Sequence, residues 1–321
     1  MKNRAMKKID SQKSQESSEI REGTTYKTCV DLNNNEEDME NITEIPPPLR
    51  KPQSTPIAHD QCTFVYFDLE TTGLGKDCEV TQIGACLSEE SFSQYVLPST
   101  QSISPSATAV SGIAVKENLM FKNGMQVPCK NTKDAMKTFV AWLKKISNIV
   151  LVAQNAKFDS SVIVRAMHQV GLSANDFIIG FIDTLTLFRE AVPNSRSYKQ
   201  VDLLKDLCTS HYDAHDALAD PQALQRLVLH LEISRGMMKK HSFGVEFVIE
   251  NDNYAIVMSR NASSLKHLVD ENILSKFTAN KIAASGLHYD HLCKLPPEDH
   301  RHRHESGPDT SPTNICYCLL V

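Results

Sequence analysis

The chain has 321 residues, 41% of them hydrophobic and 23% charged, a composition typical of a globular protein with room for one large or two small domains. Its 34 basic and 39 acidic residues give a net charge of −5, and 7 basic and 10 acidic residues in the first 45 account for −3 of it. The remainder is close to neutral, which argues against a protein that coats long duplexes through a broad basic face.

No secretion signal and no run of about 18 apolar residues is present, so we expect a protein without a transmembrane segment. The nine cysteines show neither CxxC pairs nor the spacing of zinc ligands, which favours reduced thiols. Together these features predict a location in the nucleus or cytoplasm and exclude secretion.

The first 60 residues differ in composition from the rest. Lys, Arg, Asp, Glu, Ser, Asn and Gln dominate up to residue 45, and PPPLRKPQSTPI follows at 46–57. Polar segments of this kind cannot bury enough apolar surface to fold, and proline-rich segments are extended. We therefore predict a disordered polar arm and linker over residues 1–60.

Apolar runs from residue 61 onward predict an α/β domain. CTFVYFDL at 62–69 is typical of a buried strand, and EVTQIGACLSEESFSQYVLP at 79–98 predicts two more strands joined by a turn at SEES. Helical spacing over 132–147, with Asn131 or Thr132 as a cap, precedes the strand NIVLVAQ. A helix over 157–170, the strand DFIIGFID and helices over 200–208 and 215–233 complete the pattern, which indicates a mixed sheet flanked by helices over residues 61–235.

The C-terminal part is predicted as a small helical extension over 236–295 and a flexible tail over 296–321. GVEFVIENDNYAIVMSR at 244–260 is compatible with a hairpin, and the residues up to 292 predict two short helices that stop at Ser285 and Gly286. The tail ends in CYCLLV, so lipid attachment at Cys318 and a solvated tail with apolar last residues are both open. We expect the solvated tail, because Val is not a usual last residue of a prenylation motif.

Three short acidic motifs occur in fixed order: FDLETTGL at 67–74, NAKFD at 155–159 and HDALAD at 215–220. Asp68 and Glu70 lie two apart at the end of a predicted strand and so point to one face, where two carboxylates inside a sheet are costly without a cation. Asp159 starts a helix directly after a strand. Each motif alone has an ordinary explanation, as a surface strand, a helix N-terminal acid or an amphipathic helix.

His215 and Asp220 are five residues apart, so they cannot share one face of a continuous helix. We predict that His215 lies on the loop before the helix and that Asp220 projects from its first turns. Pro221 follows Asp220 and is tolerated only in a first turn, so the helix either begins near 217–219 or kinks there.

Taken together, the motifs resemble those of the DnaQ-like 3′-to-5′ exonucleases of the DEDDh type, over roughly residues 61–235. The resemblance implies a ribonuclease H-like fold with a mixed five-stranded sheet, and two Mg²⁺ or Mn²⁺ ions held by four carboxylates. The metal ligands it implies here are Asp68, Glu70, Asp159 and Asp220. It also implies that His215 is the general base, since histidine exchanges protons near neutral pH.

The expected metal site also indicates how the substrate is held, because a 3′-hydroxyl must lie at the strand end beside the metals. Backbone around Leu69 and Thr71 is expected to contact the terminal nucleotide, and Leu74 to wedge against its base. The expected substrate is a single-stranded or frayed 3′ end of DNA, with RNA as the other choice. Lys157, Arg165, Arg196 and Lys199 are candidates for phosphate contacts.

Two functions stay open from the sequence. The first is a metal-dependent 3′-to-5′ exonuclease. The second is a catalytically weak or inactive nuclease-fold binding or scaffold module of PML-like type, supported by Pro221 and the near-neutral surface. Within the family, the motifs look most similar to the animal three-prime repair exonucleases and to the exonuclease-like domain of long PML isoforms, and the stretch at 264–292 resembles the tail that follows the PML-type domain. The complete ligand set favours the enzyme.

Overall fold

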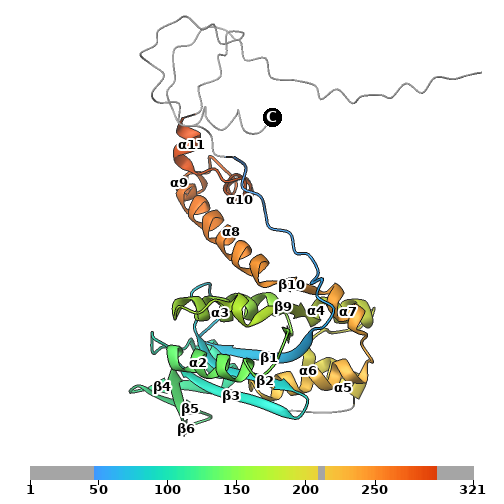
Figure 1. Cartoon of the computed structure of the whole chain (residues 1–321). Coiled ribbons are helices and arrows are strands. Elements are labelled where there is room, and N and C mark those ends of the chain that lie inside the picture. The colour runs from blue at the N-terminus through green and yellow to red at the C-terminus, as the bar shows by residue number, and fades with distance from the viewer. Residues whose placement is uncertain (1–46, 209–213, 295–321) are drawn as a thin grey trace, which may run out of the picture. The chain divides into compact units, whose positions relative to one another are not determined.

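A computed structural model describes residues 47–208 and 214–294 (Figure 1). The predicted disordered arm up to residue 46, the tail after residue 294 and Cys318 lie outside these described residues. Among the described residues, no helix is both long and apolar enough to cross a membrane.

A seven-stranded mixed sheet forms the centre of the fold, in the order β10-β9-β8-β1-β2-β3-β7. The five strands expected from the sequence are confirmed, and three-residue strands extend both edges. The strands are β1 (Thr63–Thr71), β2 (Val80–Leu87), β3 (Glu90–Leu97), β7 (Cys129–Asn131), β8 (Ile149–Ala153), β9 (Ile178–Asp183) and β10 (Ser242–Gly244). β1 is antiparallel to β2 and parallel to β8, so the fold class is α/β with a mixed sheet, as predicted.

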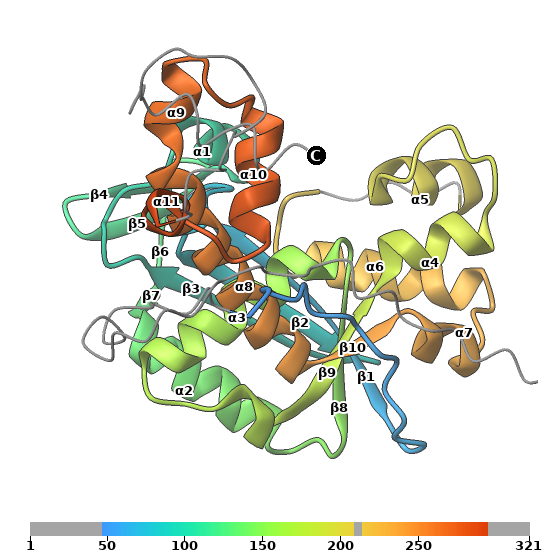
Figure 2. The same ribbon diagram turned by 90° about the horizontal axis from the view of Figure 1, so that it is seen from above.

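Helices cover both faces of this sheet. In Figure 2, α4 to α7 lie together beside one face and α2 and α3 beside the other. Each layer has its own apolar core: Phe67, Phe139 and Ile163 belong to one, and Tyr66, Phe188 and Leu224 to the other. The helices are α2 (Thr132–Leu143), α3 (Ala156–Gln169), α4 (Thr184–Ala191), α5 (Gln200–Cys208), α6 (Ala219–His230) and α7 (Arg235–Lys240), with a 3-10 turn η2 (Ala174–Asp176).

The predicted helix cap at Asn131 is confirmed, because its side chain accepts a hydrogen bond from the backbone N–H of Asp134. α3 likewise ends before Gly171, which has a positive φ of 76°. Each of these signals depends on a single residue. The Asn131 side chain supplies the cap, and Gly171 supplies the backbone freedom needed where the helix ends.

The connection between β3 and α2 contains structure that the sequence did not predict. It holds α1 (Pro105–Ser111) and a separate three-stranded antiparallel sheet of β4 (Ile113–Lys116), β5 (Leu119–Lys122) and β6 (Met125–Val127). These strands are three or four residues long, so their alternation of apolar and polar residues is too short to detect.

The extension after residue 236 is mainly helical, as predicted, but the hairpin considered for 244–260 is wrong, since these residues form most of the helix α8 (Val245–Ser264). Val245 and Val248, three apart, are both buried against the main core, which a helix allows and a strand pair does not. The apolar groups FVI and AIV are typical of strands, and the NDN between them is typical of a turn. The sequence pattern is therefore also compatible with a hairpin.

Three short helices follow α8 and share a small apolar core with it. They are α9 (Lys266–Asp270), α10 (Lys276–Ala284) and α11 (Tyr289–Cys293). This core includes Leu265, Leu268, Ile282 and Leu292. The predicted helical stop before Gly286 is confirmed, because α10 ends at Ala284.

Candidate active site

Asp68 and Glu70 project from the end of β1 toward the layer that contains α6. Val65, Phe67 and Leu69 point into the core on the α3 side, and Tyr66 points into the other core. Because side chains alternate along a strand, Asp68 and Glu70 continue the face of Tyr66. The register of β1 against β2 shifts between Glu70 and Thr71, so an irregularity in the strand pairing lies beside the two carboxylates.

Asp159 reaches the same place from the first turn of α3. β8 runs parallel to β1, so the chain leaves β8 at the edge of the sheet where Asp68 and Glu70 lie. Asn155 turns it into α3 with a left-handed backbone, φ 57°. Asp159 is 5% exposed and hydrogen-bonds to backbone at residues 159 and 69, so its carboxylate lies against β1.

Asp220 comes from α6, and His215 from the loop before it, as the sequence predicted. α6 begins at Ala219, so Pro221 lies in the first turn, where no intrahelical N–H is needed. His215 has a left-handed backbone, φ 67°, and its N–H donates to Oδ2 of Asp220 at 2.9 Å. The proline therefore does not kink the helix away from the site.

A glycine on β2 allows this segment to lie close to β1. Gly84 is paired with Asp68, and a Cβ placed on Gly84 would lie 1.3 Å from the carbonyl oxygen of Ala217. Only a residue without a side chain permits that approach. Gly84 thus brings the backbone between His215 and Asp220 against the strand beside Asp68.

The resulting cluster of acids is strongly repulsive without a cation. Burial, followed by the charges of Asp159, Asp220 and Glu70, holds the pKa of Asp68 well above its usual range. Burial and the charge of Asp220 raise the pKa of Glu70 to about 7. Burial raises the pKa of Asp159 to about 8, although its backbone hydrogen bonds act in the opposite direction.

These residues fit a divalent cation. One ligand atom each from Glu70, His215 and Asp220 lie within 4.8 Å of one another, and Asp68 and Asp159 are close enough to repel the other carboxylates. Hard divalent cations prefer carboxylate oxygens, and binding one would remove the repulsion. The five residues proposed from the three motifs are therefore brought to one place.

Two charged residues beside the cluster were not predicted. Lys122, at the end of β5, donates to the carbonyl of His215 at 3.1 Å and lies 3.6 Å from Asp216. Asp216 accepts from the backbone N–H groups of Leu218 and Ala219 at the start of α6. Lys122 is 93 residues from His215 in the chain, so no local sequence signal connects them.

Gln200, at the start of α5, is a further neighbour that the sequence did not reveal. Its Nε2 donates to the backbone carbonyl of Asp220 at 2.8 Å, and it is 8% exposed. A buried amide in this position fixes the first turn of α6, which orients the Asp220 carboxylate.

The residues expected to contact the substrate lie beside Glu70. Leu69 is buried in the core, and the hydroxyl of Thr71 donates to the carbonyl of Gly73 at 2.7 Å. The side chains of these two residues are therefore not available to a ligand, and contact through their backbone stays a prediction. Leu74, in contrast, is 88% exposed on the loop after β1.

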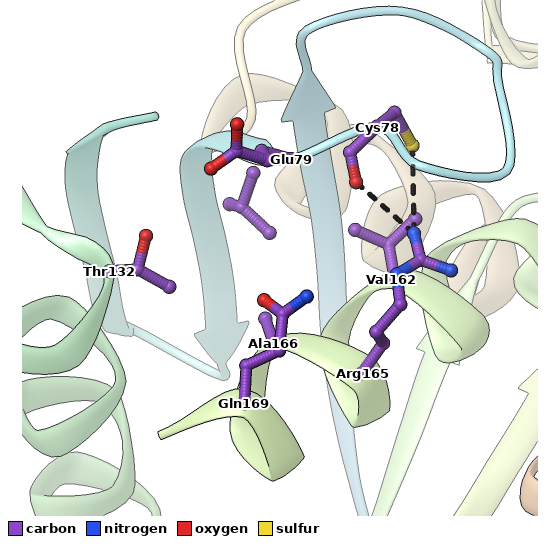
Figure 3. Close-up of a pocket in the computed structure, with 8 residues that line it drawn as sticks. Cys78, Glu79, Thr132, Val162, Arg165, Ala166 and Gln169 are labelled. Atoms are coloured by element: carbon purple, nitrogen blue, oxygen red, sulfur yellow. Dashed lines mark hydrogen bonds between the residues drawn. The ribbon is translucent and has the colours of Figure 1, made fainter. Parts of the chain in front are cut away.

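Two of the proposed phosphate-binding cations already have protein partners. Arg165 of α3 donates to the carbonyl oxygen of Cys78 at 3.1 Å and lies 3.9 Å from its sulfur, as Figure 3 shows beside Glu79 and Thr132. Arg196 pairs with Asp206 at 3.4 Å. Arg165 thus anchors the loop that carries Leu74 instead of reaching toward a nucleotide.

Comparison with known families agrees with the geometry. A family model described as Exonuclease (RNase_T) matches residues 65–228, just over half of the chain. The chain belongs to this exonuclease family. The predicted resemblance to DnaQ-like nucleases is confirmed, and hydrolase chemistry on nucleic acid is the activity of the family.

Curated relatives of this exonuclease chain are much longer than it is. The PolC-type DNA polymerase III of Caldanaerobacter subterraneus is 28% identical over 193 residues, which cover 58% of this chain and 12% of the polymerase. That of Oceanobacillus iheyensis is 25% identical over 214 residues, covering 59% of this chain and 14% of the polymerase. The chain therefore spans only a small part of these relatives.

Solved structures of exonucleases are also similar. E. coli ExoI in its zinc-bound complex with single-stranded DNA has 16% identity and a TM-score of 0.45, over 68% of this chain and 50% of that chain. The nuclease domain of 3'hExo, a DEDDh family member bound to rAMP, has 16% identity and a TM-score of 0.44, over 58% of this chain and 98% of that one.

A second family model, described as PML, C-terminal domain, matches residues 261–301. The stretch at 264–292, in which the sequence suggested a PML-like tail, falls inside this match. The described residues of this match form the end of α8 and the helices α9 to α11.

Proposed function

We propose that this chain is a metal-dependent 3′-to-5′ exonuclease that hydrolyses the phosphodiester bonds of DNA from single-stranded or frayed 3′ ends. The observation that carries the proposal is the convergence of four carboxylates, from β1, α3 and α6, with one histidine. These residues lie far apart in the sequence, and the fold brings them to one edge of the sheet.

The carboxylates of Asp68, Glu70, Asp159 and Asp220 would hold two divalent cations, Mg²⁺ or Mn²⁺. Bound there, such ions polarise the phosphate and stabilise the charge that develops on the attacking and leaving oxygens. The exposed His215 side chain then accepts a proton from the attacking water, as a general base. The backbone of Leu69 and Thr71 positions the terminal nucleotide, and Leu74 packs against its base.

The alternative is a nuclease-fold binding module with little or no activity. It is favoured by the match of residues 261–301 to the PML C-terminal domain, and by the near-neutral charge of the chain after residue 45. The complete set of five residues argues for the enzyme, since a binding module would not need four clustered carboxylates that repel one another.

The test is digestion of matched oligonucleotides by the full chain with Mg²⁺, with Mn²⁺ and with a chelator. A 5′-labelled single strand should shorten stepwise, and a 3′-labelled one should release labelled mononucleotide at once. Asp68→Asn should abolish both, while Asp176→Asn, at an exposed position outside the site, should have no effect.

Three results would contradict the proposal. Cleavage of circular single-stranded DNA would indicate an endonuclease, and early release of a 5′ label would indicate the opposite direction. Binding without hydrolysis under every metal condition would favour the binding module. Parallel digestion of single-stranded DNA, duplex DNA and RNA identifies the preferred substrate.

A further inference from the structure

Lys122 connects the small sheet to the proposed active site. It is the last residue of β5, its side chain is 16% exposed, and its ammonium group contacts both the carbonyl oxygen of His215, at 3.1 Å, and the carboxylate of Asp216, at 3.6 Å. Its charge also acts on Glu70, where it opposes the effects of burial and of Asp220.

The backbone that Lys122 contacts has an unusual conformation. His215 has φ 67°, a left-handed conformation that costs energy for a residue with a side chain and persists only where surrounding contacts impose it. Those contacts come from two sides, because its N–H donates to Asp220 and its carbonyl accepts from Lys122. The direction of the imidazole therefore depends on both.

Asp216 extends the same support to α6. Its Oδ1 accepts from the backbone N–H groups of Leu218 and Ala219, at 3.0 and 3.2 Å, and its Oδ2 faces Lys122 and Gln82. Lys122 is thus tied through Asp216 to the turn that carries Asp220.

From these contacts we infer that Lys122 is a positioning residue that holds the His215–Asp216 backbone so that the imidazole faces the acidic cluster. This inference rests on the proposed nuclease function. A phosphate-binding role fits less well, because the ammonium group already contacts two protein oxygens and the side chain is only 16% exposed.

The kinetic test compares Lys122→Met with Lys122→Arg and Lys116→Met. Met keeps the stem of Lys122 but removes the charge and the donors, and we expect kcat to fall about 10- to 100-fold with little change in KM, as for other outer residues that orient a site. Arg restores a cationic donor and should recover much of kcat. Lys116 lies exposed on the neighbouring strand β4, so its change should have no effect.

A double variant separates positioning of His215 from electrostatic action on Glu70. In a His215→Ala background there is no imidazole to orient, so adding Lys122→Met should cost far less than it does alone. A full additional loss, together with a higher Mg²⁺ concentration for half-activity, would overturn the inference and assign Lys122 to the metal site.

Hydrogen exchange tests the inference without requiring activity. Peptides covering residues 214–218 should exchange faster in Lys122→Met than in wild type or Lys116→Met. Unchanged protection would overturn the inference even if the nuclease is active. Faster exchange in a protein without nuclease activity would support the positioning contact while the proposed function fails.

Discussion

The backbone N–H of His215 is hydrogen-bonded to the Asp220 carboxylate, at 2.9 Å from Oδ2, although the two residues would face different directions on a continuous helix. The left-handed backbone of His215 makes the contact geometrically accessible. A proposed metal ligand and the proposed general base are therefore mechanically linked, and the link uses the backbone of His215, not its imidazole.

This link predicts a specific phenotype for His215→Ala. The variant keeps the N–H that donates to Asp220, so the Mg²⁺ concentration for half-activity should not change, but loss of the base should lower kcat about 10²- to 10⁴-fold. The melting temperature should stay close to wild type, because His215 is exposed. His230→Ala, at an exposed position at the end of α6, is the control, and wild-type kcat in His215→Ala would exclude the histidine from the reaction.

The raised pKa values predict that the metal-free protein loses stability as pH rises. In the folded state the pKa is about 7 for Glu70 and about 8 for Asp159, against 4.5 and 3.8 in their ordinary states. Between these values the folded protein retains protons that the unfolded chain has released, so the free energy of unfolding should fall from about pH 4 to about pH 8.

Urea unfolding in chelator at several pH values measures this dependence, and Asp159→Asn should flatten it. Mg²⁺ or Mn²⁺ binds the deprotonated folded site, so added metal should raise the melting temperature more at pH 8 than at pH 6. A stability that rises with pH across this range, or a metal effect that is larger at pH 6, would contradict the proposed ligand cluster.

The exposed Leu74 predicts a separation of binding from chemistry. Leu74→Ala removes apolar contact area from a side chain that is 88% exposed, so the stability of the free protein should not change. If the side chain packs against the terminal base equally in the ground and transition states, KM should rise several-fold at nearly constant kcat. Leu229, 65% exposed on α6, supplies the control Leu229→Ala. An unchanged KM would remove Leu74 from the substrate site.

The sequence predicted those parts of the molecule that depend on local patterns. Asp68 and Glu70 follow an apolar strand, Asn131 caps α2, and Pro221 restricts the start of α6, so each could be placed from its neighbours along the chain. Lys122 and Gln200 could not, because their contacts with the His215–Asp220 segment join residues 93 and 20 positions apart. The hairpin considered for 244–260 failed for a related reason, since the burial of Val248 against the main core decides between helix and strand there.

Gly84 provides the most direct test of how the fold builds the site. A methyl group at this position would lie 1.3 Å from the carbonyl oxygen of Ala217, and backbone cannot yield as a flexible side chain can. Gly84→Ala should therefore push the segment before α6 away from β2, at a cost of about 1–3 kcal/mol in the free energy of unfolding. The same displacement moves His215 and Asp220 away from Asp68, the residue paired with Gly84, so metal affinity and kcat should both fall.

Gly75→Ala is the matched control for Gly84→Ala, because nothing lies within 4 Å of a Cβ placed there. It should leave stability, metal affinity and kcat at wild-type values. Chemical denaturation, metal titration and the mononucleotide-release assay measure the three quantities on the same two variants. If Gly84→Ala loses stability but keeps full activity, the site does not depend on this close approach. If it keeps both, the approach of residue 217 to β2 is not the packing of the protein in solution.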